Sequence, residues 1–338
     1  MIPVSLPGGN YYASLVLSLI CLSTLLTWLA RLAVDRGARQ WLRGHRRLGP
    51  AMMAVLAVAG GIFPYQHVSQ WLAAQREARD EQARRAVLDA GRRLAGIDMP
   101  AGTTLRLAEA GNPDSFVQAD FPTQVEIGGL LVRQLFRYRR AAGANSVPTE
   151  SWSVTLPADQ PVQGWTCSHH HRAELLLDRR GKPRFDSCHL AAGNTLDGQP
   201  LPAGTWLDLR QEAPARWLLR TDGREPAVVQ GLPLLKADIS VDDRRRLLSF
   251  EGLLAHELTL GALTYPTGTR AGSATGVSGA QPGDLLFSPP RGRSARRDGE
   301  ADVAAGQSVL QAPDGTVRAV LGNHEAGVLD VATMRIGP

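Results

Sequence analysis

The sequence contains little cysteine and little lysine. Its 338 residues include three cysteines, and only Lys182 and Lys236 among the 37 basic residues are lysines. The basic character is therefore almost wholly arginine, which together with abundant alanine and glycine indicates a bacterial coding bias of high GC content. The basic residues also lack the clustered helix and the aromatic platforms of nucleic-acid-binding modules. We therefore expect no nucleic acid partner.

The motifs of common enzymes are missing as well. The chain has no phosphate-binding loop, no Gly-x-Ser-x-Gly elbow and no His-Glu-x-x-His helix. His256-Glu257 and His324-Glu325 are isolated pairs without a second histidine at helical spacing. We assign no catalytic residue and expect no cofactor, which favours recognition over catalysis without excluding an enzyme.

A long uncharged run lies near the N-terminus. Residues 11–30 are twenty residues without a charge, enough to span a hydrocarbon core of about 30 Å as a helix. Tyr11, Tyr12 and Trp28 suit the two membrane interfaces. A cleaved signal peptide fits poorly, because the basic residues follow the apolar run.

A second apolar run covers residues 48–64 and contains Gly60, Gly61 and Pro64. Seventeen residues is the lower limit for a membrane span. We predict a two-helix transmembrane hairpin over residues 1–66. The alternative is a re-entrant or interfacial segment, which would leave the C-terminal part in the cytoplasm.

Arginines crowd the segment between the two runs and predict its side of the membrane. Short loops rich in arginine stay in the cytoplasm. The loop would then be cytoplasmic, and both termini and the C-terminal domain would be periplasmic, in a bacterial inner membrane. Arg76, Arg79, Arg84 and Arg85 weaken this prediction because they follow the second run closely. The arginines expected to determine topology are Arg31, Arg36, Arg39, Arg43, Arg46 and Arg47.

Apolar residues at helical spacing continue beyond the hairpin. Val68, Trp71, Leu72, Val87, Leu88 and Leu94 form a narrow stripe. We expect a helical stalk over residues 67–96, with residues 67–94 as a surface on which a second copy could pack. A structural stalk protein that oligomerises through this helix is therefore one alternative function.

From residue 97 to 338 short apolar runs alternate with turn residues, which is typical of many short strands. Glycines open comparable segments at spacings of 35, 34, 33 and 30 residues, and a Pro-x-Gly-Thr tetrad recurs at residues 100–103, 202–205 and 266–269. This periodicity predicts a mainly β domain of about six antiparallel repeat units. The alternative is an irregular β-sandwich. The repeating glycines are Gly129, Gly164, Gly198, Gly231 and Gly261.

The segment LLLDRRGKPRFDSCHLAAGNTLDGQPLPAGTWLDL resembles the β-hairpin repeats of bacterial envelope proteins in the style of the MORN and YwqK-like families. The resemblance covers residues 97–338. It implies an interaction or scaffold module, and some such modules are protective, immunity-like partners of toxins. An accessory subunit of a secretion or envelope complex would have the same architecture. Residues 271–300 interrupt the pattern and are predicted to be a flexible loop.

Two cysteines fall in the predicted periplasmic part. Cys167 and Cys188 form an even pair, which predicts a disulfide in an oxidising compartment, whereas Cys21 lies in the first apolar run. Two alternatives remain. The pair could join His169 and His189 in a metal site, although the ligand spacing is unusual for zinc, or both thiols could be free. An envelope hydrolase or metal-dependent enzyme would use these four residues. The expected partners are the lipid bilayer and another envelope or secreted protein.

Overall fold

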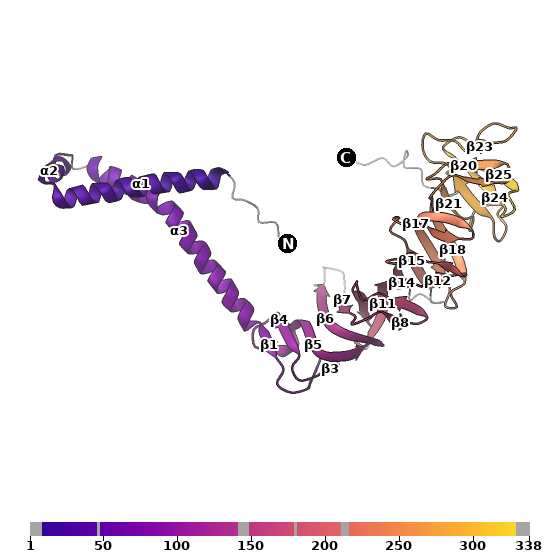
Figure 1. Cartoon of the computed structure of the whole chain (residues 1–338), viewed down its shortest axis with the longest axis horizontal. Helices are drawn as coiled ribbons and strands as arrows, with labels where there is room; N and C mark the ends of the chain where they lie inside the picture. The colour runs from indigo at the N-terminus through magenta and orange to yellow at the C-terminus, as the bar shows by residue number, and fades with distance from the viewer. Residues whose placement is uncertain (1–8, 46–47, 141–148, 179–180, 211–215, 329–338) are drawn as a thin grey trace. The chain divides into compact units, whose positions relative to one another are not determined.

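The computed structural model describes residues 9–45, 48–140, 149–178, 181–210 and 216–328. The chain divides into two compact units, Met1–Arg84 and Arg85–Pro338 (Figure 1). The first unit is helical and the second is built from strands. Arg46 and Arg47 of the predicted topology loop lie outside the described residues.

Three helices make up the described part of the first unit, and two of them form the predicted hairpin. They are α1 (Gly9–Val34), α2 (Arg36–Gly44) and α3 (Leu48–Ala83). By length and composition, α1 and α3 could each cross a membrane. The two helices touch at Gly60, where a Cβ atom would lie 3.0 Å from the backbone nitrogen of Leu22. A small residue at this point therefore allows the two backbones to approach closely.

One hydrogen bond between α1 and α3 follows directly from the proline in α3. Pro64 has no N–H, so the carbonyl of Gly60, four residues earlier, cannot receive its usual helical hydrogen bond. Ser18 of α1 donates its hydroxyl to that carbonyl at 2.6 Å. Pro64 therefore lies within a continuous helix instead of ending it.

The predicted stalk helix is shorter than expected. α3 ends at Ala83, whereas the helical stripe was expected to reach Leu94 and the stalk residue 96. Residues 85–87 and 92–94 are instead the strands β1 and β2 (Arg92–Leu94). The apolar stripe was misleading because Leu88 and Leu94 belong to the core of the β unit, while Val68, Trp71 and Leu72 are exposed on α3.

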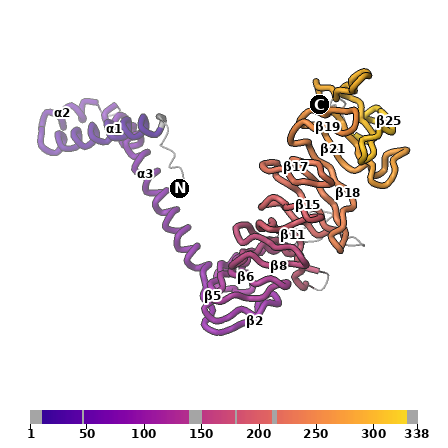
Figure 2. Tube along the Cα trace, turned by 45° about the vertical axis from the view of Figure 1, so that its right-hand side comes forward, coloured from indigo at the N-terminus to yellow at the C-terminus, as the bar shows by residue number. Residues whose placement is uncertain are grey.

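Sixteen strands of the described chain form one antiparallel sheet, and they follow one another almost in chain order (Figure 2). This meander is a single sheet and not the two facing sheets of the sandwich alternative. The strands are β1 (Arg85–Val87), β4 (Thr104–Leu107), β5 (Phe116–Ile127), β6 (Leu130–Arg140), β7 (Thr149–Thr155), β10 (Ala173–Leu177), β11 (Pro183–His189), β14 (Trp206–Arg210), β15 (Arg216–Arg220), β17 (Leu232–Val241), β18 (Leu247–Leu254), β21 (Arg270–Ser273), β22 (Leu285–Ser288), β24 (Gln307–Gln311) and β25 (Val317–Gly322), with β16 (Ala227–Val229) beside β17.

One face of the sheet is apolar because side chains alternate along each strand. Residues in register across neighbouring strands form a buried row on this face. The row begins with Ala86, Leu105, Ala119, Leu135 and Val154, and continues in β11 to β18 with Cys188, Leu207, Leu219, Ile239 and Phe250. All of these residues belong to one hydrophobic core that runs through the unit, except Ala86, which is partly buried and packs against it.

Short hairpins between the sheet strands supply the other side of this core. They are β2 with β3 (Ile97–Met99), β8 (Gln160–Val162) with β9 (Trp165–Cys167), β12 (Thr195–Leu196) with β13 (Gln199–Pro200), and β19 (Leu258–Leu260) with β20 (Leu263–Tyr265). Leu94, Trp165, Leu196 and Leu263 from these hairpins are buried in the core.

The periodic glycines occupy two-residue hairpin turns. Gly129, Gly164, Gly198 and Gly231 each have positive φ and follow a residue that also has positive φ, the combination required by a type I′ turn. Gly261 is the first residue of its turn. Gly96, between β2 and β3, is the second residue of its turn and follows Ala95, which also has positive φ. It was not among the predicted glycines.

The three Pro-x-Gly-Thr tetrads form one recurring structure, which we call the leucine clasp. In each, the threonine hydroxyl donates to the proline carbonyl at 2.7 Å, and the buried threonine's carbonyl accepts the N–H of a leucine fifteen residues earlier. The glycine N–H donates to that leucine's carbonyl. The pairs are Leu88 with Thr103, Leu190 with Thr205, and Leu254 with Thr269.

The predicted flexible loop over residues 271–300 is wrong. This segment contains most of β21, all of β22 and β23 (Arg296–Arg297). Ala271, Leu285, Phe287 and Ala295 are buried in the core. Composition misled the prediction because glycine and serine here occupy tight turns between very short strands.

Candidate functional site

At a fourth place in the sheet, the spacing and register of the leucine clasp recur with a different sequence. Leu156 lies fifteen residues before His171, the spacing that joins leucine and threonine in the three clasps, so Ser168-His169-His170-His171 occupies the place of Pro-x-Gly-Thr. The sheet register agrees. Ala173 pairs with Val154 as Leu105 pairs with Ala86 and Leu207 with Cys188. We call residues 168–171 the histidine turn.

A disulfide lies directly before the histidine turn. Cys167 of β9 is bonded to Cys188 of β11, with a Cα–Cα distance of 5.9 Å, and both residues are buried. The bond therefore ties the β8–β9 hairpin to the main sheet. The predicted disulfide is confirmed, and the free-thiol alternative is wrong.

The metal alternative loses its two sulfur ligands to this bond. Among the described residues, no group of three or more His, Cys, Asp or Glu side chains has a geometry that could hold a metal ion. The other two candidate ligands, His169 and His189, contact different residues. His169 binds Asp159, whereas His189 contacts Gly204 and Trp206.

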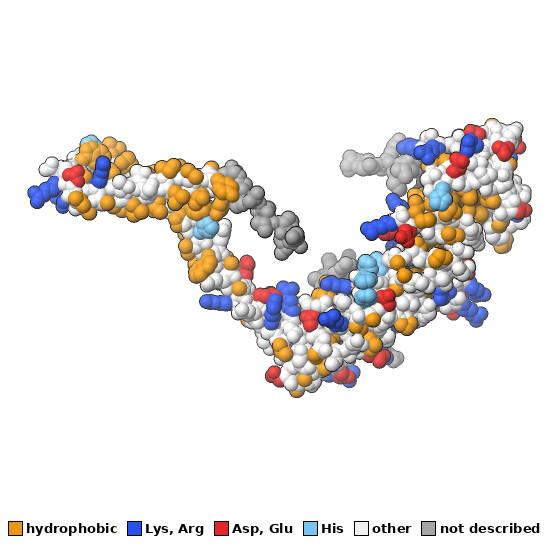
Figure 3. All heavy atoms as spheres, in the orientation of Figure 1, with side chains coloured by type: hydrophobic (Ala, Val, Ile, Leu, Met, Phe, Trp, Pro, Cys, Tyr) orange, Lys and Arg blue, Asp and Glu red, His pale blue; other side chains and the backbone are white. Residues whose placement is uncertain are grey.

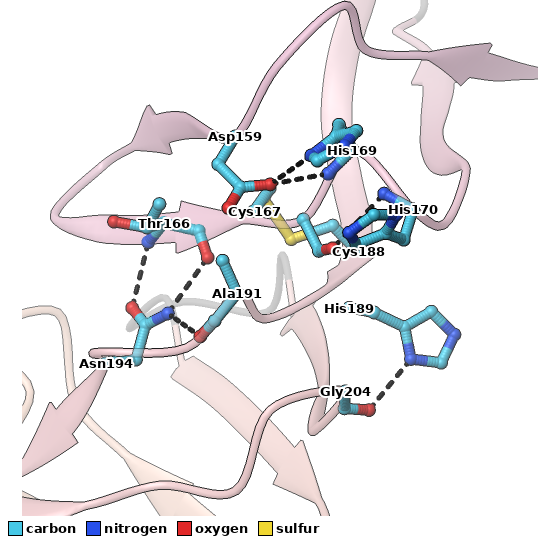
Figure 4. The surroundings of a disulfide bond; sticks show 11 residues. Asp159, Thr166, Cys167, His169, His170, Cys188, His189, Ala191, Asn194 and Gly204 are labelled. Carbon is cyan, nitrogen blue, oxygen red and sulfur yellow. Dashed lines mark hydrogen bonds and ion pairs between the residues drawn. A yellow bond between two sulfur atoms is a disulfide. The ribbon is translucent and has the colours of Figure 1, made fainter.

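Asp159 fixes His169, the first histidine of the turn (Figure 4). One carboxylate oxygen, Oδ1, accepts the backbone N–H of His169 at 2.9 Å and lies 2.7 Å from its ring Nδ1. The backbone hydrogen bond, followed by the side-chain hydrogen bond, lowers the pKa of Asp159. The carboxylate is therefore charged at neutral pH and holds the His169 ring at the surface.

The imidazole rings form two close, tilted pairs. The rings of His169 and His170 are 3.9 Å apart, and those of His171 and His189 are 4.3 Å apart. Partial burial lowers the pKa of His171, and the nearby His189 and His170 add to this effect. Figure 3 shows histidine side chains gathered at the surface of the β unit. The cluster thus presents exposed rings with an uncharged His171 at neutral pH.

His189 connects the histidine turn to the next leucine clasp. Its Nδ1 lies 2.9 Å from the carbonyl of Gly204 and donates to it, which fixes the tautomer. Its ring meets Trp206 edge-on at 4.8 Å. The backbone is joined as well, because Ser168 donates its N–H to the His189 carbonyl at 2.8 Å.

Carboxylates lie on the outward face of the sheet, on β10, β11 and β14. Burial raises the pKa of Glu174, and the charge of Asp186 adds to it. Burial and the charge of Asp208 raise the pKa of Asp186. Arg210 lies 3.3 Å from Asp208. The outward face of β10, β11 and β14 therefore carries partly buried acids.

Arg172 follows the histidine turn and completes the face. Its guanidinium carbon lies 3.7 Å from the ring centroid of Phe136, and its Nη1 donates to the Tyr138 hydroxyl at 3.3 Å. Such an arrangement of exposed rings, imidazoles and charges is suited to binding. With both cysteines oxidised, neither can act as a nucleophile.

Sequence reasoning had found Cys167, His169, Cys188 and His189 but missed Asp159, His170, His171 and Arg172 as parts of the same site. A usable signal was present. The fifteen-residue spacing between leucine and threonine in three clasps would have placed the histidines in the fourth position.

Comparisons with protein-family models, curated proteins and solved structures found no match for this chain.

Proposed function

We propose that this chain is a bacterial inner-membrane protein whose α1–α3 hairpin anchors the β unit in the periplasm, where the unit binds another envelope or secreted protein. The β unit would consist of about six hairpin repeats. It would act as an interaction module, in keeping with its resemblance to envelope hairpin-repeat proteins. A protective partner of a toxin and an accessory subunit of an envelope complex both fall within this proposal.

The observation that carries the proposed location is the disulfide. A buried Cys167–Cys188 bond in a bacterial protein favours an oxidising compartment, and two apolar helices precede it. The arginines between these helices favour a cytoplasmic loop. The N-terminal end of α1 and the C-terminal end of α3 would then lie on the periplasmic side.

The histidine turn supports recognition as the activity. In place of a clasp, it presents three exposed histidines. Asp159 holds the first of them, and the disulfide lies directly before the turn. Residues that break a local pattern often mark function. We place the binding site on the histidine turn and the adjoining outward face at Arg172 and Trp206.

The experiment grafts the clasp sequence into this turn. The variant His169→Ala, His170→Gly and His171→Thr copies residues 203–205 and keeps Ser168, whose N–H donates to the His189 carbonyl. Affinity purification from native membranes should recover a stoichiometric protein with the wild type and with the control His256→Ala, an exposed histidine on another turn. The graft should lose that protein while retaining its disulfide and its Tm. Equal recovery with the graft would show that the histidine turn is not the binding site.

A second candidate function follows from α3. Tyr65, Val68, Trp71 and Leu72 are exposed on this helix beyond its predicted span. They could pack against the same helix of a second copy, which would make the chain an oligomeric stalk protein. Mass measurement in mild detergent distinguishes the two, since a monomer would eliminate the stalk function. The variant Val68→Ser with Leu72→Ser should dissociate an oligomer.

A further inference from the structure

The short helix α2 between the two apolar helices has two different faces. Its apolar residues are held against the hairpin. Leu42 covers Gly49 so closely that a Cβ on Gly49 would lie 2.5 Å from it. Trp41 meets Trp28 of α1 edge-on at 5.4 Å. These contacts fix the rotation of α2 about its axis, so its charged side is held in one orientation relative to α1 and α3.

That charged side is formed by three arginines. Arg36, Arg39 and Arg43 recur at intervals of three and four residues, so they lie on one side of the helix, and all three are exposed. Asp35 is the only acid between Arg31 and Arg47. Its carboxylate accepts the N–H of Gly37 at 2.8 Å as the cap of α2. One acid cannot balance the six arginines of this segment.

The arginines after the second apolar run differ. Arg76, Arg79 and Arg84 are also exposed, but Glu77, Asp80 and Glu81 are interleaved with them. Three exposed arginines can thus be compared in each segment, and the first segment has an excess of positive charge whereas acids nearly balance the second. The second group is a natural control for the first.

We propose that Arg36, Arg39 and Arg43 of α2 form a binding site for the phosphate groups of anionic phospholipids. This inference rests on the proposed membrane anchoring. Trp28 and Trp41 would place α2 at the boundary between acyl chains and headgroups, because indole rings favour that depth. Guanidinium groups bind phosphate oxygens through paired hydrogen bonds, and exposed basic residues beside a span attract anionic leaflets.

The experiment measures the lipids that stay with the purified full-length chain. The protein is equilibrated in mixed micelles of equal phosphatidylglycerol and phosphatidylcholine, and the retained lipids are counted by native mass spectrometry. We expect about tenfold enrichment of phosphatidylglycerol, decreasing with salt. The variant R36Q/R39Q/R43Q should lose the enrichment. R36K/R39K/R43K should keep only part of it, because an ammonium group attracts phosphate but cannot form the paired hydrogen bonds, and the control R76Q/R79Q/R84Q should keep it in full.

Two results would overturn the inference. One is a lack of enrichment in the wild type. The other is an equal loss in R36Q/R39Q/R43Q and R76Q/R79Q/R84Q, which would indicate a general charge effect. Membrane anchoring is tested separately, by carbonate extraction of native membranes. A chain that resists extraction but retains no excess phosphatidylglycerol leaves the anchoring proposal intact. A chain released by carbonate would overturn both.

Discussion

Arg245 lies over the ring of Trp165, with its guanidinium carbon 4.0 Å from the ring centroid, although eighty residues separate them in the sequence. Its Nη1 also donates to the Gly164 carbonyl at 2.8 Å, and its Nη2 donates to the Thr195 carbonyl. The side chain thus joins the β17–β18 turn to two other hairpins.

Replacing Arg245 should therefore destabilise the β unit. We expect Arg245→Ala to lower the free energy of unfolding by about 1–3 kcal/mol, because a cation–π contact and two charged hydrogen bonds are lost. Arg244→Ala, at an exposed neighbour, should change it by less than about 0.5 kcal/mol. Urea unfolding of both variants checks this, and equal stability of the two would contradict the structural role of Arg245.

Reduction of the disulfide should have a larger effect. The bond closes a loop of 21 residues, which corresponds to about 3 kcal/mol in the chain-entropy model. Cys167→Ala with Cys188→Ala should lower Tm and make it insensitive to reductant. Cys21→Ser is the matched control. An unchanged Tm for the wild type in reductant, with the bond shown open by alkylation, would refute the prediction.

The three leucine clasps should respond alike to loss of the threonine hydroxyl. Thr103→Val, Thr205→Val and Thr269→Val each remove the 2.7 Å hydrogen bond to a part-buried proline carbonyl, which then accepts only the threonine backbone N–H. We expect a loss of about 1–2 kcal/mol for each variant in denaturant unfolding. Thr104→Val, at an exposed strand position, is the control. Widely different losses would mean that the three clasps are not energetically equivalent.

Acid should weaken the β unit through Asp284. Its carboxylate accepts the N–H of Gln281 and pairs with Arg318, whose Nε lies 2.8 Å from Oδ2. The backbone hydrogen bond and then the Arg318 interactions lower the pKa of Asp284. Because the folded pKa lies below the unfolded value of about 3.9, this stabilisation is present above that value and is lost as pH falls through the folded pKa.

The variant Asp284→Asn tests this linkage. It should be less stable than the wild type at pH 7, and the difference between the two should shrink as the pH falls below about 4. Unfolding in urea at a series of pH values gives both curves. A constant difference across that range would exclude titration of Asp284 as the cause.

Turn chemistry made parts of this fold predictable. A two-residue hairpin turn needs positive φ, so glycines such as Gly164 and Gly198 mark the turns whatever surrounds them. The pairing of Cys167 with Cys188 followed from their even number in the part of the chain predicted to be exported. The glycine signal is local to the turn, and the cysteine signal depends only on the number of cysteines. Neither requires knowledge of packing.

Other parts depended on packing that the sequence does not reveal. Leu88 and Leu94 fit a helical stripe as well as they fit strands, and only their burial in the β core decides between the two. Phe287 lies in a glycine-rich segment that composition assigns to a loop. Likewise, His171 and His189 are close only because β10 and β11 lie beside each other.

The order of the strands has a consequence for biogenesis. Nearly every sheet strand pairs with the strand that precedes or follows it in the meander, and the disulfide closes over only 21 residues. A chain that emerges progressively from a ribosome or a translocation channel can therefore add each strand to the edge already formed. The contact between Arg245 and Trp165 is an exception, and it would form only after the intervening strands are in place. Assembly can thus proceed from the N-terminal edge, with early intermediates that already have native pairing.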